Sequence, residues 1–74
     1  MRNLEIEKRL ALMADAVDQD ETRFGVLSTG ERIAVALVLE RPDLLKKDGW
    51  TILKAVDRLG PEWTAAAREV QRDR

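Results

Sequence analysis

The sequence predicts an all-α domain, a small bundle of about four helices packed around a central apolar helix at residues 29–40. The run Ile33–Leu39 is apolar at seven consecutive positions, and a helix that is apolar on every side has to be covered by other elements. Directly before it, Ser28-Thr29-Gly30-Glu31 has the spacing of a capping box, which marks a helix start. A buried strand is the competing interpretation of the run, but the chain offers no second strand for it to pair with.

The first helix is expected at about residues 4–18. Asn3 is a suitable N-cap, and Glu5 and Glu7 stand in the first turn, where the helix dipole favours negative charge. Apolar residues then recur at the spacing of one helix face: Ile6, Leu10, Met13 and Val17. The Phe24-Gly25 pair ends the segment that follows, since a glycine after the last periodic residue is a stop signal.

The second half of the chain carries further boundaries. The central helix ends before Pro42, because the residue before a proline is pushed out of helical geometry. Residues 42–47 begin with proline and end with lysines, the pattern of a short helical turn.

Asp48 can then cap a helix at 49–59, for which we expect four buried side chains: Ile52, Leu53, Val56 and Leu59. Gly60 supplies a left-handed stop, and Pro61 opens a last helix at 61–72. That helix has a narrow apolar stripe of one large and three small residues: Trp63, Ala66, Ala67 and Val70.

The composition excludes several kinds of site. The 74 residues form one domain, 1–74, without cysteine or histidine, so we expect no disulfide, no metal and no other cofactor. We also expect no enzyme, because the usual general base is missing and the single serine, Ser28, is assigned to a helix cap. No apolar run approaches the roughly 20 residues of a membrane span. Without an export signal, the cytoplasm is the expected location.

One motif favours DNA binding. Ala55-Val56-Asp57-Arg58-Leu59-Gly60, followed by a helix, is similar to the helix-turn-helix of the factor-for-inversion-stimulation type of regulator. In that motif an alanine packs between the two helices and a leucine–glycine pair makes the turn, which implies a regulator that uses residues 49–59 and 61–72. The second helix begins Pro61-Glu62-Trp63-Thr64-Ala65, however, without a basic or amide side chain for base edges. Thirteen basic against fourteen acidic residues also give no general attraction to phosphate. Nucleic acid is therefore not the expected partner.

The favoured function is a non-enzymatic, intracellular protein–protein interaction or regulatory module that binds another protein or itself. Tryptophan is enriched among interface hot spots, so Trp50 and Trp63 are candidate anchors, together with Phe24 beside an acidic stretch. The competing interpretation places both tryptophans half-buried at the edge of the bundle. Leu4 and Leu12 lie beside the main stripe of the first helix, so that helix is the expected contact of a homodimer. The helix-turn-helix regulator is the alternative function.

Overall fold

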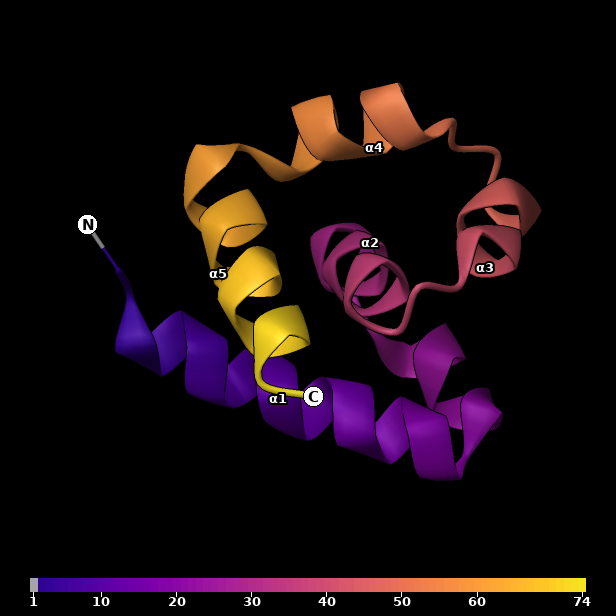
Figure 1. Cartoon of the computed structure of the whole chain (residues 1–74). Helices are drawn as coiled ribbons and strands as arrows, with labels where there is room; N and C mark the ends of the chain where they lie inside the picture. Colours follow the sequence, from indigo (N-terminus) through magenta and orange to yellow (C-terminus); the bar gives the residue numbers. More distant parts are fainter. Residues whose placement is uncertain (1) are drawn as a thin grey trace.

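The structure, a computed structural model, describes residues 2–74, and these contain no strand. Six helices follow one another (Figure 1): α1 (Leu4–Gln19), the 3₁₀ helix η1 (Glu21–Val26), α2 (Thr29–Val38), α3 (Pro42–Lys47), α4 (Ile52–Leu59) and α5 (Pro61–Arg72). The predicted all-α class is confirmed. Within residues 2–74, none of the helices combines the length and the hydropathy that crossing a bilayer requires.

The apolar run is a helix and not a strand, and the predicted capping box begins it. The Ser28 hydroxyl accepts the backbone N–H of Glu31 at 3.4 Å, and the Glu31 carboxylate accepts the backbone N–H of Ser28 at 2.9 Å. These two bonds satisfy amide donors that a helix start otherwise leaves without partners.

The end of α2 is a Schellman motif with an unusual residue at its centre. The N–H of Arg41 donates to the carbonyl of Ala36 at 2.9 Å, and the N–H of Glu40 donates to that of Leu37 at 3.2 Å. Glu40 adopts φ +54°, a left-handed conformation that glycine usually supplies. Because glutamate is not a turn signal, the sequence predicts the end of this helix only through Pro42.

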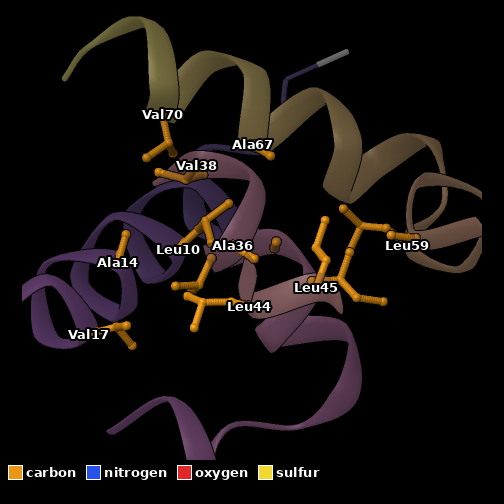
Figure 2. Close-up of a cluster of buried hydrophobic side chains, with 14 of the residues drawn as sticks. Leu10, Ala14, Val17, Ala36, Val38, Leu44, Leu45, Leu59, Ala67 and Val70 are labelled. Carbon is orange, nitrogen blue, oxygen red and sulfur yellow. The ribbon is translucent and has the colours of Figure 1, made fainter. Parts of the chain in front are cut away.

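The hydrophobic core draws on every helix of the described chain. The segment α2 contributes five buried residues and contacts α1, α3, α4 and α5, and Figure 1 shows it nearly end-on between them. Helix α1 contributes Leu10, Ala14 and Val17. Leu10 and Val17 belong to the predicted apolar stripe, and Ala14 does not. Figure 2 shows these side chains in one cluster with buried side chains of α2, α3 and α5. Among the fully buried side chains, the largest are Leu10, Ile33 and Val35.

Three details of the predicted plan are wrong. The described chain has six helices and not about four, because residues 21–26 form η1, which the sequence does not predict, and the short helical turn predicted at 42–47 is the helix α3. The helix predicted at 49–59 begins only at Ile52, with the Thr51 hydroxyl accepting the N–H of Lys54 at 3.3 Å. Asp48 cannot cap it because Asp48 ends α3, and Gly49 follows at φ +84°. Ile52 and Leu53, which the sequence places in the core, are exposed.

Arg32 of α2 connects the 3₁₀ helix η1 to the rest of the domain. Its guanidinium donates to the carbonyls of Leu27 at 3.0 Å and Gly25 at 2.8 Å, and its Cζ lies 5.9 Å from the centre of the Phe24 ring. A carboxylate oxygen of Asp48, at the end of α3, lies 3.6 Å from a guanidinium nitrogen of Arg32. One side chain of α2 therefore holds both the segment before it and the segment after it.

The first and the last helix of the described chain are neighbours in space. Helices α1 and α5 pack against each other, and polar side chains bridge their ends. The Asn3 amide donates to Glu62 at 2.9 Å, and Arg74 pairs with Asp15 at 2.8 Å. The Gln71 amide also donates to the Leu37 carbonyl of α2 at 3.0 Å. These contacts join residues that are far apart in the sequence.

Candidate interaction surface

The three aromatic candidates lie in or against the core. Phe24 is buried beneath the Arg32 guanidinium. Trp50 and Trp63 are half-buried and pack against the core cluster, as the competing interpretation of the tryptophans expects. In this position Phe24 has no face free for a partner's pocket, and each tryptophan already uses part of its ring within the domain.

The two leucine candidates of α1 are exposed but do not form one patch. Leu4 and Leu12 are 66% and 64% exposed. Leu12 lies opposite the buried side chains of α1, because Leu10 and Ala14 are each two residues away and successive residues are about 100° apart around a helix. Leu4 lies beside the start of α5, where it lines a groove with Pro61, Glu62 and Ala65. Only Leu4 therefore adjoins another apolar surface.

Two adjacent exposed apolar side chains lie on α4, where the sequence predicts buried ones. Leu53 is 82% exposed and Ile52 is 57% exposed, while Val56 is half-buried. The buried side chains of α4 are Ala55 and Leu59. The apolar arc of this helix therefore continues past the part that the core covers, and we call exposed Ile52 and Leu53 together with half-buried Val56 the α4 face.

A shallow groove of about 410 Å³ continues the α4 face at its C-terminal end. This α4–α5 groove lies at the turn between the two helices. Four residues of its lining have no polar side chain: Val56, Gly60, Pro61 and Ala65. The other three are Asp57, Thr64 and Arg68. Pro61 and Ala65 line the groove of Leu4 as well, so apolar surface runs from α1 across the start of α5 to α4.

The charges beside the α4 face are not engaged in ion pairs within the domain. Lys54 and Asp57 are exposed and lie one turn apart on α4. Among residues 2–74, neither has an oppositely charged group within 4.0 Å. Both charges are therefore available to a partner.

A larger groove of about 600 Å³ lies between α1 and α5, but three of the five charged side chains in its lining, Glu7, Asp15 and Arg74, already have partners. Glu7, in its lining, receives two bonds from the Arg2 guanidinium, at 2.6 and 3.1 Å. These hydrogen bonds hold the pKa of Glu7 below its ordinary value. Asp15, also in the lining, pairs with Arg74. Because a partner would have to break these bonds, the α4 face is the better candidate surface.

The sequence holds one signal that could have identified the α4 face. Five of the eight residues in Ile52–Leu59 are apolar, and they occupy about half of the helix circumference. A two-turn helix packed on one side of a small core cannot bury an arc of that width. A helix that starts at residue 49, as the sequence predicts, would have a third turn, and the mismatch would be smaller.

The turn at Gly60 differs from the helix-turn-helix that the sequence resembles. Gly60, at φ +86°, is both the C-cap of α4 and the N-cap of α5, so one residue links the helices, whereas that motif has a turn of about three to four residues. On α5, the Thr64 hydroxyl donates to the Gly60 carbonyl at 2.6 Å, and Arg72 pairs with Glu69 at 3.2 Å. Both side chains are thus used within the domain.

No group of three or more histidine, cysteine or acidic side chains within residues 2–74 has the arrangement of a metal site. The Asp20 carboxylate instead caps η1, accepting the N–H and the hydroxyl of Thr22 at 3.1 and 2.6 Å, and these bonds lower the pKa of Asp20. Comparison of the chain with protein-family models, with curated proteins and with solved structures found no match.

Proposed function

We propose that this chain is a non-enzymatic protein–protein interaction module, and that the α4 face with the adjoining groove is its binding surface. The observation that carries the proposal is the 82% exposure of Leu53 next to half-buried Val56 and a groove with apolar lining. Clustered apolar side chains that remain in water are a feature of binding sites. The polar residues around them, Lys54 and Asp57, match the usual anatomy of an interface, in which a polar rim surrounds an apolar centre.

The non-enzymatic part of the proposal rests on the chemistry of the available side chains. The chain has no cysteine and no histidine, and its single serine hydroxyl is engaged in the cap of α2. An interaction surface needs none of these groups. Its contribution to binding comes from burial of apolar area and from shape.

Site-specific photo-crosslinking in the cells that express the chain tests the proposal. A photo-reactive amino acid in place of Leu53 should give a covalent adduct, because this position would be buried against a partner. The matched control replaces Leu12, which is also an exposed leucine on a helix. Adducts at position 53 and not at position 12 are the expected result. No adduct at position 53, or equal adducts at both positions, would contradict the proposal.

DNA binding is the alternative function, and we expect it to fail. The exposed residues of α5 include Arg68 and Arg72, but Arg72 is paired with Glu69 and the first turn carries Glu62. Binding to duplex DNA should be micromolar or weaker at physiological salt and fall with added salt, as non-specific contacts do. Selection from random DNA tests whether the chain prefers any one sequence. One enriched motif, with binding lost in Arg68→Ala, would favour the regulator.

A further inference from the structure

We infer that the partner of the α4 face is a second copy of this chain, bound through an antiparallel pairing of α4 with α4 about a two-fold axis. This inference rests on the proposed function and adds the identity of the partner and the register. It also differs from the dimer that the sequence predicts, which uses Leu4 and Leu12 on α1.

The charges of α4 carry the first part of the argument. Lys54 and Asp57 are equally distant from the point between Ala55 and Val56. A two-fold axis through that point therefore places Lys54 of one copy level with Asp57 of the other, and the reverse pair forms at the same time. Both groups lie one turn apart on the helix and are exposed. A parallel pairing would instead place like charges level with each other, which disfavours it.

The shape of the surface carries the second part. The exposed leucine stands at the N-terminal end of α4, and the groove lies at its C-terminal end, around Gly60 and Pro61. An antiparallel arrangement brings the protruding end of each helix to the hollow end of the other. The positions 53, 56, 57 and 60 also share one side of the helix, because they are spaced by three, four and seven residues. The same side thus offers both a knob and a groove.

The size of the surface determines how tight the dimer is. A standard stable interface buries about 800 Å² on each partner, which is a large share of the 5065 Å² that the described chain exposes. The α4 face and its groove involve only two turns of one helix and the start of another. We therefore expect a weak dimer, with a Kd of about 10 µM to about 100 µM.

A charge exchange within α4 tests the register. Sedimentation velocity on the whole chain, from about 10 µM to about 1 mM, gives the dimer Kd. Lys54→Glu and Asp57→Lys should each weaken the dimer about tenfold, because each places like charges across the axis. The double variant Lys54→Glu/Asp57→Lys restores opposite charges and should recover the Kd of the unchanged protein to within about threefold. Two single effects that simply add in the double variant would contradict the register.

Leucine substitutions test the surface. Leu53→Ser should raise the Kd at least about tenfold, whereas Leu12→Ser should leave it unchanged. Both side chains are exposed, so both variants keep the helical circular-dichroism spectrum. A chain that stays monomeric up to about 1 mM, or a dimer that depends on Leu12 and not on Leu53, would overturn the inference.

The crosslinking experiment separates the two proposals: an adduct at position 53 of twice the 8.4 kDa chain mass supports both. An adduct of another mass, from a chain that is monomeric alone, leaves the proposed function standing and rejects the second copy.

Discussion

Val35→Asp is expected to unfold the domain. The Val35 side chain has no exposed surface and lies at the middle of α2, among residues that contact four other helices. An unpaired carboxylate placed there costs several kcal/mol, and a chain of this length has only about 3–5 kcal/mol of net stability. Far-UV circular dichroism at neutral pH should show loss of the helical signal.

The matched control for this variant is Val26→Asp, the same substitution at the end of η1. Val26 is 84% exposed, so its replacement leaves the new carboxylate in water. We expect the control to change the free energy of unfolding by less than about 0.5 kcal/mol. Retention of a helical spectrum and of a cooperative melt in Val35→Asp would mean that α2 does not organise the core.

Leu10→Ala is expected to have the second-largest effect. Leu10 is fully buried in α1, and Figure 2 shows its side chain within the core cluster. Removing three carbons from such a site loses both transfer free energy and packing contacts, and it should lower the free energy of unfolding by about 3 kcal/mol. For a domain of this size, that corresponds to a fall in Tm of about 15 °C.

The same substitution two residues later provides the comparison. Leu12→Ala removes the same atoms from the same helix, but from a position that faces solvent, so we expect a change within about 0.5 kcal/mol. Thermal melts of both variants at two protein concentrations would measure the difference. Equal losses in the two variants would mean that the face of α1 is assigned incorrectly, and a loss in Leu12→Ala only at high concentration would indicate a dimer through α1.

The features of the fold that the sequence predicts correctly are those with local causes. The Ser28–Glu31 capping box needs only four consecutive residues, and the stripe of Leu10 and Val17 on α1 follows from helical periodicity alone. The end of α2 could not be predicted in the same way. Its left-handed residue is Glu40, whose conformation is maintained by bonds from Arg41 and Glu40 to carbonyls of the preceding turn and not by a residue type that favours it.

The candidate site depended on longer-range facts. Periodicity identifies the apolar arc of α4 but does not reveal how much of it the rest of the chain covers. That depends on where α4 begins, and a single threonine cap at Thr51 moved the start by three residues from the predicted one. The sequence therefore predicts Ile52 and Leu53 in the core, and the enrichment of aromatic residues in interfaces favours Phe24, which is buried.

The packing of α1 against α5 determines when this domain can form during its own synthesis. A ribosome releases residues 4–19 long before residues 61–72, at about 5–20 residues per second. Until α5 emerges, the buried side of α1, including Leu10 and Ala14, lacks the helix that covers much of it. An isolated helix of this length is marginal in water. The core around α1 therefore cannot close before residues 61–72 have left the ribosome.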